Sequence, residues 1–428
     1  MNKADLIVIG AGPGGYRAAE YAAKKGLKVT LFEGDNVGGT CLNVGCIPTK
    51  TYVHSATFEE ARHRMAAVIP QLRQGVESIL SHPNITLVRG RARFVSAGSV
   101  CSDTVATDSE YTAPNIIIAT GSETKWLPIK GHDDSRVVDS TGLLNLDTLP
   151  RRLAIIGAGV IGMEFASVFH RFGSEVTVIE YLKECLPALD SDIAKRLRKT
   201  LDRQRVGDGT SGMKRGITFK MKTAVENLAD IDADVILMAT GRRPYTEGLN
   251  LNVLGITLAP NGAIPVDDNF RVATVPGGSP SAIYAIGDVN GRQMLAHAAE
   301  MQAERAVNHI LGLKDGIRFD VMPAAIFTTP EAACVGPTED MLDVPYVCKK
   351  SFWRANGKAQ AMGETEGMLK LLVGADDRIL GCHAYGAHAA DIVQEVAVLI
   401  CRETTLEQLR DIIHIHPTLS EVLRAAAE

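Results

Sequence analysis

The chain has 428 residues, of which 46% are hydrophobic and 22% charged, and its formal net charge is −5. This balance indicates a soluble globular protein, and the length predicts about three domains. Charges of both signs are interspersed, which argues against partners such as nucleic acid or an anionic membrane. Apolar stretches end well short of the roughly 18 residues that a membrane span needs, and the opening MNKADLIVIG leaves no room for a signal peptide. Eight scattered cysteines are not a disulfide scaffold, and they favour a reducing, cytoplasmic location.

A dinucleotide-binding fingerprint begins the chain. A strand of buried type over 5–10 runs into glycines, a helix follows over 17–26, and a second strand over 28–33 ends in an acid. The residues that define this fingerprint are Gly10, Gly12, Gly15 and Glu33. Glycines let backbone N–H groups approach a pyrophosphate at the helix N-terminus, and the acid can accept from ribose hydroxyls. Glycine spacing alone is a weak signal that a tight structural turn also explains, but the full context favours dinucleotide binding.

Residues 38–50, GGTCLNVGCIPTK, carry the most distinctive chemistry. Cys41 and Cys46 stand five apart in a segment too rich in glycine to be a plain helix, and a turn through Gly45 would bring them within disulfide distance. Pro48 suits the beginning of a helix, which would place Cys46 just ahead of a helix N-terminus, where a thiolate is favoured. The interpretation is a redox-cycling dithiol, and two unrelated buried cysteines are the alternative.

A second fingerprint follows between residues 153 and 180. It has the same order of strand, glycines, helix, strand and acid, with Gly157, Gly159, Gly162 and Glu180. Two fingerprints predict two dinucleotides with electrons passing between them. Glu180 would repel a 2′-phosphate, so this second site is expected to prefer NAD over NADP, an inference that the nearby Lys183 weakens only slightly.

Three further segments flank the fingerprints. The strands in 114–122 and 233–244 both run into Ala-Thr-Gly, a turn suited to close approach by a ligand or a neighbouring strand. The strand in 282–289 ends in Gly287-Asp288, and this carboxylate either contacts a flavin or caps the helix that follows. Residues 52–80 are predicted to be helical, and residues 203–216 an exposed loop.

The pattern changes from about residue 322. Strands precede a helix over 390–403 with a broad apolar face, which is typical of a separate domain that presents a surface to a partner subunit. The chain closes on HIHPTLSEVLRAAAE, where Glu421 follows His416 by five residues at the start of a helix. A histidine oriented by a carboxylate suits a general base for a thiol, and a structural histidine is the alternative.

These motifs resemble the class I pyridine nucleotide-disulfide oxidoreductase family of flavoenzymes, and within it the dihydrolipoamide dehydrogenases most closely. The resemblance extends along nearly the whole chain and implies an α/β fold. It implies two Rossmann-like dinucleotide-binding domains, one for FAD (1–145) and one for NAD (146–245). A small central region (246–320) and a C-terminal α+β dimerisation domain (321–428) would complete the fold.

The resemblance also implies roles for individual residues. Cys41 is expected to exchange with substrate and Cys46 to lie against the flavin, while Lys50 approaches the flavin and pairs with Glu164. His416 and Glu421 are expected to act across the interface of a homodimer. The implied FAD site comprises Gly10, Gly12, Gly14, Gly15, Glu33, Gly39, Thr40, Lys50, Ala119, Thr120, Gly121, Gly287 and Asp288, and the implied NAD site comprises Gly157, Gly159, Gly162, Glu180 and Gly241. No metal site is expected.

The implied reaction is dihydrolipoamide plus NAD+ to lipoamide plus NADH, with the lipoyl group presented by a 2-oxo acid dehydrogenase complex or the glycine-cleavage system. A glutathione-type reductase is one rival, although its NADPH pocket is usually basic where this chain has Glu180. A catalytically impaired flavoprotein assembly subunit is the other rival, because the chain is shorter than is usual for the family. In particular, too little chain lies between Thr223 and Asp234 for the β-meander that the family usually inserts there.

Overall fold

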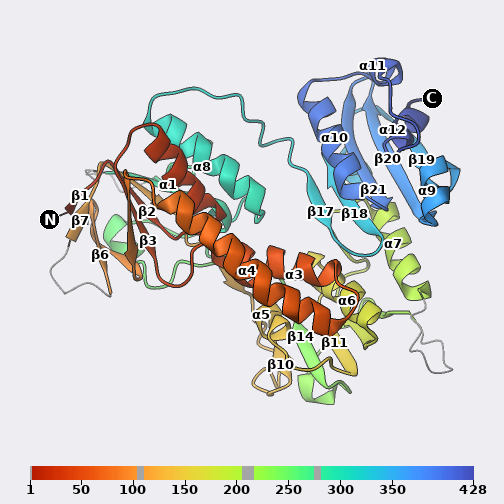
Figure 1. The fold of residues 1–428 in the computed structure, drawn as a ribbon, viewed down its shortest axis with the longest axis horizontal. Helices are drawn as coiled ribbons and strands as arrows, with labels where there is room; N and C mark the ends of the chain where they lie inside the picture. Colours follow the sequence, from red (N-terminus) through yellow and green to blue (C-terminus); the bar gives the residue numbers. More distant parts are fainter. Residues whose placement is uncertain (1, 104–109, 205–215, 274–280) are drawn as a thin grey trace. The chain divides into compact units, whose positions relative to one another are not determined.

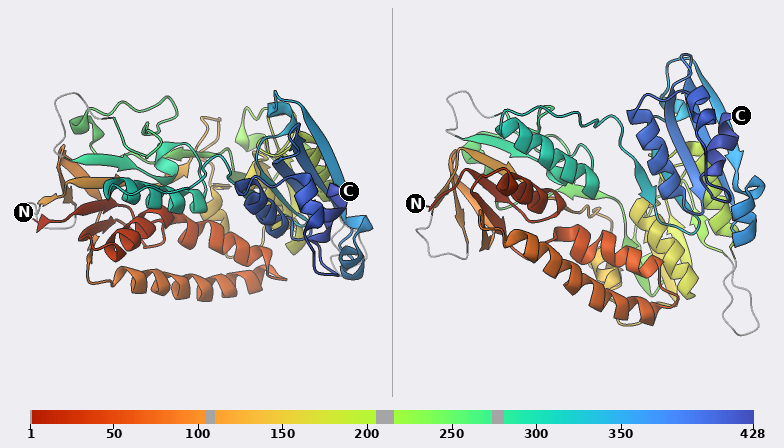
Figure 2. Two further views of the ribbon diagram at one scale, coloured as in Figure 1. Left: turned by 90° about the horizontal axis from the view of Figure 1, so that it is seen from above. Right: turned by 45° about the horizontal axis from the view of Figure 1, so that its top comes forward.

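The computed structural model describes residues 2–103, 110–204, 216–273 and 281–428. The chain divides into two compact units: unit 1 is Met1–Thr51, Glu59–Lys125 and Arg242–Ile317, and unit 2 is Tyr52–Phe58, Trp126–Gly241 and Arg318–Glu428. Each unit is mixed α/β with helices packed on sheets (Figures 1 and 2), which confirms the predicted fold class. The four-domain division stays a prediction, and the expected loop at 203–216 lies largely outside the described residues.

Unit 1 is built on a five-stranded parallel sheet with the order β16-β8-β2-β3-β4. Its strands are β2 (Leu6–Ile9), β3 (Val29–Glu33), β4 (Ile85–Arg89), β8 (Asn115–Ile118) and β16 (Ala282–Ala285). β2 is apolar and buried throughout, as expected for a parallel strand covered on both faces. α1 (Pro13–Lys24) packs on β2 and β3, and α8 (Ala296–Ile310) lies beside α1 (Figure 1).

A smaller sheet, in the order β1-β7-β6-β5, joins the same core. Its strands are β1 (Asn2–Lys3), β5 (Ala92–Ser96), β6 (Ser99–Ser102) and β7 (Glu110–Thr112). Phe94 and Val100 of this sheet share a buried cluster with Ile7, Ile9 and Phe32 of the parallel sheet. The remaining elements of this part are α2 (Gly39–Val44), α3 (Cys46–Val53), α4 (Phe58–Leu80), β9 (Ser122–Thr124), β15 (Arg242–Pro244), η2 (Leu251–Leu254) and η3 (Gly287–Asn290).

Unit 2 begins with a second parallel sheet, in the order β10-β14-β11-β12-β13. Its strands are β10 (Val137–Val138), β11 (Arg152–Ile156), β12 (Glu175–Ile179), β13 (Thr218–Lys220) and β14 (Val235–Met238). α6 (Val160–Phe172) packs on β11 and β12, and α5 (Ser140–Leu144) and α7 (Ser191–Arg203) complete this part. Between Thr223 and Asp234 the described chain forms one short turn, η1 (Leu228–Asp230), so no β-meander is inserted there.

The C-terminal part of unit 2 contains an antiparallel sheet in the order β17-β18-β21-β20-β19. Its strands are β17 (Ala324–Ile326), β18 (Glu331–Val335), β19 (Tyr346–Phe352), β20 (Gly367–Gly374) and β21 (Ile379–Gly386). Its helices and helical turns are η4 (Glu339–Met341), η5 (Trp353–Ala355), α9 (Gly357–Met362), α10 (Ala389–Cys401), α11 (Leu406–Asp411) and α12 (Glu421–Ala427).

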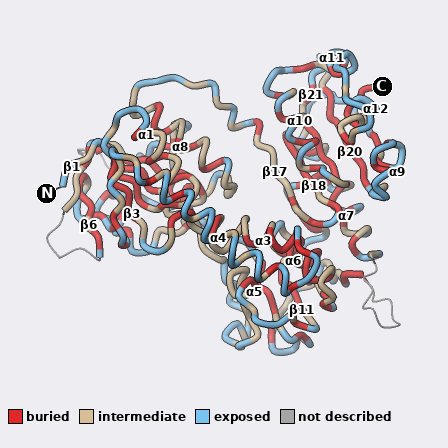
Figure 3. Tube along the Cα trace, in the orientation of Figure 1, coloured by how far each residue is buried: buried red, intermediate tan, exposed pale blue. Residues whose placement is uncertain are grey.

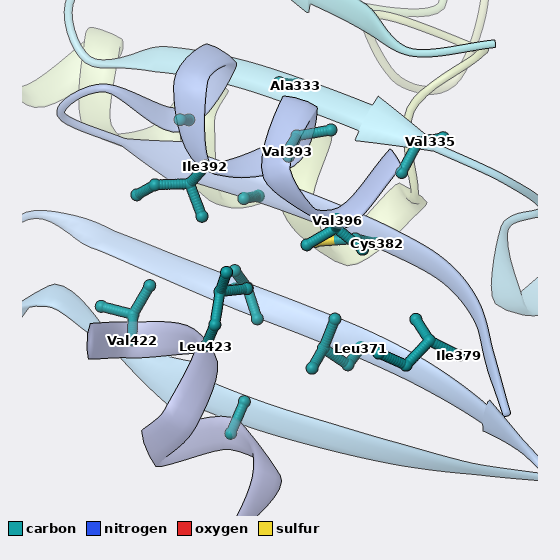
Figure 4. Close-up of a cluster of buried hydrophobic side chains, with 14 of the residues drawn as sticks. Ala333, Val335, Leu371, Ile379, Cys382, Ile392, Val393, Val396, Val422 and Leu423 are labelled. Atoms are coloured by element: carbon teal, nitrogen blue, oxygen red, sulfur yellow. The ribbon is translucent and has the colours of Figure 1, made fainter. Parts of the chain in front are cut away.

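The broad apolar face of α10 is covered within the chain itself. Ile392, Val393 and Val396 of this helix meet the sheet in one buried cluster, to which α12 adds Val422 and Leu423 (Figure 4). The expectation that this face is presented to a partner subunit is therefore wrong for most of the helix. Val398 of the same helix is 55% exposed, and Figure 3 shows where buried and exposed positions lie along the chain.

Candidate active site

The two cysteines of the 38–50 stretch lie where two short helices meet. Cys41 is in α2, Cys46 is the first residue of α3, and Gly45 separates the helices. Both cysteines are free thiols, and that of Cys41 is hydrogen-bonded to that of Cys46. A side chain at Gly45 would collide with the α2 backbone, because its Cβ would lie 2.8 Å from the Thr40 carbonyl oxygen.

The stretch is not one plain helix, as expected, but two short helices interrupted at Gly45. Residues 39–44 and 46–53 are helical because the glycines gather at the helix ends, where Gly38 and Gly39 adopt positive φ. α3 also begins earlier than expected, so Pro48 is its third residue and Cys46 lies within its first turn. The helix predicted over 52–80 is α4, which begins only at Phe58.

The pKa of the Cys41 thiol is raised far above its usual range. The hydrogen bond to Cys46 is the largest cause, followed by burial and by the negative charge of the Cys46 sulfur, while the ammonium of Lys50 opposes the shift. Cys46 itself is exposed at the N-terminal end of α3, where the helix dipole favours a negative charge. The two thiols therefore differ in kind, because the hydrogen bond to Cys46 and burial both favour the protonated form of Cys41.

The first fingerprint forms a tight cradle at the end of β2. A Cβ on Gly15 would lie 1.8 Å from the Gly10 carbonyl oxygen, and one on Gly10 would lie 2.5 Å from the Ala119 carbonyl oxygen. Gly12 differs, because its nearest neighbour would be 3.9 Å away, and α1 has no side-chain cap at this end. The open N-terminus of α1 and the absence of a side chain at Gly12 fit a pyrophosphate.

Glu33 closes this cradle. Its Oε2 accepts a hydrogen bond of 2.7 Å from the backbone N–H of Ala11, and its Oε1 accepts one of 2.8 Å from Asp35. Burial raises the pKa of this carboxyl despite the two bonds. Gly14 lies against α8, and Gly39 approaches Gly12 so closely that a Cβ on Gly39 would lie 2.7 Å from the Gly12 Cα.

The second fingerprint repeats this geometry in unit 2. Cβ atoms on Gly162 and Gly157 would lie 2.0 Å from the Gly157 oxygen and 2.5 Å from the Ala239 oxygen, respectively. A Cβ on Gly159 would meet nothing within 4 Å, and α6 also has no side-chain cap at its beginning. Glu180 accepts from the N–H of Ala158 at 2.6 Å and of Leu182 at 2.7 Å. The second cradle therefore fits a dinucleotide on the same grounds as the first.

The Ala-Thr-Gly turns follow β8 and β14 as predicted, with Gly121 at φ +74° and Gly241 at φ +102°. Thr120 donates from its hydroxyl to the Tyr245 carbonyl oxygen at 2.6 Å. Thr40, another residue of the expected FAD site, is an exposed residue of α2.

Asp288 lies in η3 and does not cap the following helix, which begins only at Ala296. Its Oδ2 accepts a hydrogen bond of 2.5 Å from the Ser122 hydroxyl, and the Nε of Arg242 donates to that hydroxyl oxygen at 2.7 Å. Burial raises the pKa of Asp288, against the effects of Ser122 and Arg242. The capping alternative is therefore wrong, and the carboxylate is a half-buried acceptor.

A buried amide lies beside Asp288. Gln302 accepts at Oε1 from the N–H of Gly287 and from the amide of Asn290, both at 2.8 Å. Its Nε2 is buried and has no hydrogen-bond partner among the described residues. A buried donor without a partner at this position fits a site that binds a polar ligand.

The predicted couple of His416 and Glu421 is formed. His416 Nδ1 donates to Glu421 Oε1 at 2.9 Å, and the backbone N–H of Thr418 donates to Oε2 at 2.9 Å. The hydrogen bond from His416 is the main cause that lowers the pKa of Glu421. With Nδ1 engaged in this way, Nε2 faces outward as the basic nitrogen, and 79% of the His416 side chain is exposed.

Lys50 lies in α3 within unit 1, and Glu164 is buried in α6 of unit 2, where it accepts from the N–H of Phe327 at 2.9 Å. Their predicted pairing stays a prediction. Sequence reasoning missed Ser122, although it directly follows the first Ala-Thr-Gly turn. It also missed Arg242, which directly follows the second Ala-Thr-Gly turn in the same way.

Two dinucleotide cradles, with a hydrogen-bonded thiol pair in the same unit as the first of them, define an enzyme that moves electrons between dinucleotides and sulfur. Among the residues described, no group of His, Cys, Asp and Glu is arranged to hold a metal ion, and no helix has the length and hydropathy of a membrane span.

Comparison with known proteins identifies the family. Residues 4–303 match the pyridine nucleotide-disulphide oxidoreductase family, and residues 322–427 match its dimerisation domain. The chain is 37% identical to leghemoglobin reductase of Glycine max (99% of this chain, 87% of that protein). It is 36% identical to the mitochondrial dihydrolipoyl dehydrogenase of Pisum sativum (99% and 90%). Among solved structures, the Cu(II) complex of the HOCl-induced flavoprotein disulfide reductase RclA from Escherichia coli matches with a TM-score of 0.90 at 32% identity, over 100% of this chain and 99% of that chain.

The chain belongs to the pyridine nucleotide-disulphide oxidoreductase family. It is a flavoprotein disulfide oxidoreductase whose cofactors are FAD and a nicotinamide dinucleotide. The alignment with the Pisum sativum enzyme extends over 460 positions against 428 residues here, so the chain is shorter than that relative within the aligned region.

Proposed function

We propose that the protein is a dihydrolipoyl dehydrogenase, which oxidises dihydrolipoamide and reduces NAD+. The observation that carries this proposal is the presence in one chain of the Cys41–Cys46 thiol pair and of the histidine–carboxylate pair of His416 and Glu421. A thiol pair can exchange with a substrate dithiol, and the outward-facing nitrogen of His416 can take the substrate's proton. The names of the dihydrolipoyl dehydrogenase relatives support the same substrate.

In this proposal the chain's own groups handle sulfur and protons. Nε2 of His416 takes a proton from one substrate thiol, and the resulting thiolate attacks Cys41 of the oxidised pair. This step forms a mixed disulfide and releases Cys46 as a thiolate. The second substrate thiol then gives up its proton and its sulfur attacks the first, which closes the lipoyl ring and releases Cys41, and Cys41 takes up that proton. The raised pKa of Cys41 supports this distribution of charge in the reduced pair.

We propose that FAD is held by the first cradle and NAD by the second. The FAD residues are Gly10, Gly12, Gly14, Gly15, Glu33, Gly39, Thr40, Lys50, Ala119, Thr120, Gly121, Gly287 and Asp288, and the NAD residues are Gly157, Gly159, Gly162, Glu180 and Gly241. Bound there, FAD would supply the two-electron chemistry that links the dithiol to the nicotinamide dinucleotide. Glu180 supports NAD over NADP, because its carboxylate would repel a 2′-phosphate. Lys50 and Glu164 are proposed to support the flavin region as an ion pair.

We further propose that the protein is a homodimer in which His416 and Glu421 serve the partner's thiol pair. The match to a dimerisation domain supports this proposal, as does the exposure of the apolar side chains beside His416, Ile413 at 95% and Ile415 at 79%. The domain boundaries 1–145, 146–245, 246–320 and 321–428 belong to the same proposal. The substrate's lipoyl group would be presented by a different protein, part of a 2-oxo acid dehydrogenase complex or of the glycine-cleavage system. The eight free thiols support a reducing compartment such as the cytoplasm.

A second candidate is an NADH-driven reductase for a different disulfide. The near end-to-end match with the disulfide reductase RclA favours this alternative. Steady-state rates with dihydrolipoamide, lipoamide and glutathione disulfide, each with NAD(H) and NADP(H), distinguish the two. Turnover of dihydrolipoamide with NAD+ at a rate at least comparable to that of any other pair supports the main proposal. Absence of dihydrolipoamide turnover overturns it, and absence of flavin reduction by saturating NADH would indicate an inert assembly subunit.

Replacement of His416 by alanine tests the proposed base. Loss of a positioned base is expected to slow dihydrolipoamide oxidation by roughly 10²–10⁴-fold. NADH reduction of the bound flavin involves no substrate thiol and should be unchanged, which a stopped-flow measurement can follow. An unaltered rate of dihydrolipoamide oxidation would remove His416 from the mechanism.

A further inference from the structure

The side chain of Asn43, between the two cysteines, is fully engaged within unit 1. Its Nδ2 donates to the carbonyl oxygens of Gly39 at 2.8 Å and Val37 at 3.1 Å. Its Oδ1 accepts from two nitrogens of Arg73, Nε at 3.0 Å and Nη2 at 2.7 Å. Because Arg73 can only donate and the carbonyls can only accept, these partners also determine which amide atom of Asn43 is the oxygen and which is the nitrogen.

Arg73 reaches this position from a distant part of the sequence. It is a half-buried residue of α4, the long helix to which sequence reasoning assigned no chemistry. Two guanidinium nitrogens donate to one oxygen as a fork. Such charge-assisted hydrogen bonds are shorter and stronger than neutral ones. A lysine ammonium on a flexible stem cannot reproduce this geometry.

The segment that Asn43 holds has little rigidity of its own. Gly38 and Gly39 have φ of +92° and +58°, and α2 has no side-chain cap at its beginning. Glycine leaves the unfolded backbone many conformations, so a cross-link from side chain to backbone is needed to define one of them. The Asn43 amide supplies that link one turn from the helix start, and Arg73 in turn holds the amide.

We propose that Arg73 is a positioning residue for the dithiol, which through Asn43 keeps the Cys41 sulfur in register with that of Cys46. Disulfide formation removes two electrons from the pair, together with whichever protons the reduced thiols hold, and its equilibrium depends on how often the sulfurs meet. Loss of the clamp therefore disfavours the disulfide. This inference deepens the proposed function but rests only on the redox pair, so it can be tested whichever disulfide or dithiol the enzyme uses.

The test measures the equilibrium of the Cys41–Cys46 pair of the holoenzyme against mixtures of reduced and oxidised dithiothreitol, with alkylation and mass spectrometry as the readout. Oxidised dithiothreitol takes the electron pair, and its own S–S bond breaks. Arg73→Met is expected to lower the equilibrium constant for disulfide formation about tenfold, which makes the reduction potential about 30 mV more positive. Arg73→Lys keeps the charge but not the fork, and it should show most of the same shift.

Arg64→Met is the matched control. Arg64 lies on the same helix, where it pairs with Glu60 at 3.8 Å, and both side chains are exposed. This variant loses the same charge and the pairing with Glu60 while the Arg73 fork on Asn43 stays in place, so its equilibrium should equal that of the wild type. An equal shift in Arg64→Met and Arg73→Met would overturn the proposal in favour of a general charge effect.

A double-mutant cycle excludes a diffuse structural effect. If Arg73 acts through Asn43, the double variant Arg73→Met/Asn43→Ala should show no larger shift than Asn43→Ala alone. Additive shifts, or an Arg73→Met equilibrium within twofold of the wild type, would contradict the assignment. Thermal unfolding and flavin content, measured alongside, identify any variant that has lost its fold. Rates with dihydrolipoamide report separately on the proposed function.

Discussion

At the scale of single residues, the thiol pair is the most informative feature. The raised pKa of Cys41, caused first by its hydrogen bond to Cys46 and then by burial, distinguishes the two sulfurs although they are five residues apart. The difference arises from position, because Cys41 is half-buried within α2 whereas Cys46 is exposed at the beginning of α3. This difference fits the roles proposed above, with Cys41 in bond exchange and Cys46 against the flavin.

Replacement of Cys41 by serine should abolish dihydrolipoamide oxidation, because no disulfide can then form with Cys46. Bound FAD and its reduction by NADH should persist, since neither cradle contains this sulfur. Absorbance spectra of the purified variant before and after addition of NADH check both points. Loss of FAD from the variant would contradict the exchange role and indicate a structural one.

Residue-scale prediction succeeded where a motif is local in sequence and failed where partners are distant. Glu421 was assigned to His416 because five residues and a helix start bring them together, and their 2.9 Å hydrogen bond confirms this contact. Arg73 and Arg242 could not be assigned, because an exposed-looking arginine gives no sign of which distant oxygen it will meet. Long-range side-chain pairing depends on packing that the local pattern does not encode.

At the scale of elements, a buried ion network ties α7 to the C-terminal sheet within unit 2. Lys370 of β20, only 1% exposed, donates to Asp190 at 2.7 Å and also to Glu339. Asp190 in turn caps α7, accepting from the N–H groups of Asp192 and Ile193. Its own N–H donates to Nδ1 of His383 at 3.2 Å, so every member of the network has a partner.

Replacement of Lys370 by methionine should cost roughly 3–5 kcal/mol of unfolding free energy, the usual effect of leaving a buried charge without its partner. Lys350→Met is the matched control on the neighbouring strand. Lys350 is 41% exposed and pairs with Asp192 at 3.7 Å, so its loss should change stability by less than about 0.5 kcal/mol. Urea unfolding followed by circular dichroism measures both, and similar values for the two variants would contradict the role of the buried network.

The same network defines a pH range. Burial alone would raise the pKa of Asp190, but the hydrogen bond and charge of Lys370 outweigh it, so the net shift is downward. For Lys370, burial alone would lower the pKa, but the hydrogen bonds and charges of Asp190 and Glu339 outweigh it, so the net pKa shift is upward. The stabilisation is therefore complete between the unfolded-state values of about 4 and about 10.4, and it is lost as pH falls through the lowered carboxyl pKa or rises through the raised lysine pKa. Unfolding midpoints of wild type and Lys370→Met should converge beyond both limits, and a constant difference across pH would argue against this linkage.

Element prediction was accurate where hydrophobic runs and glycines coincide. β2, β11, β8 and β14 follow from short apolar runs that end in Gly or Ala-Thr-Gly, and the two fingerprint helices begin at those glycines. In residues 38–50 it missed α2 and placed the beginning of α3 too late, and it failed for α10, whose apolar face is satisfied by its own sheet. Periodicity identifies an apolar face but does not say which surface covers it.

At the scale of the whole molecule, the match of residues 322–427 to a dimerisation domain makes the association of chains the property to test. Ile412, Ile413 and Ile415 form an exposed apolar segment directly before His416, with exposures of 39%, 95% and 79%. Such a segment beside a proposed general base suits burial against a second copy of the chain.

An Ile413→Asp/Ile415→Asp double variant should shift the protein from dimer to monomer, because two charges cannot be buried in an apolar interface without partners. Sedimentation velocity measures the association state. Dihydrolipoamide oxidation should fall in parallel, while NADH still reduces the flavin. Leu313→Asp, which changes an apolar residue of unit 1 that is 47% exposed, serves as control and should remain dimeric. A fully active monomer would show that His416 serves its own chain.

The open position of the His416 ring has a practical consequence for kinetic work. If the imidazole completes the site only after two chains meet, the specific activity with dithiol should decline as the assay is diluted below the dissociation constant, by mass action. Electron flow from NADH to an artificial acceptor would keep a constant specific activity over the same range. The ratio of the two rates would then report the fraction of chains that are dimeric.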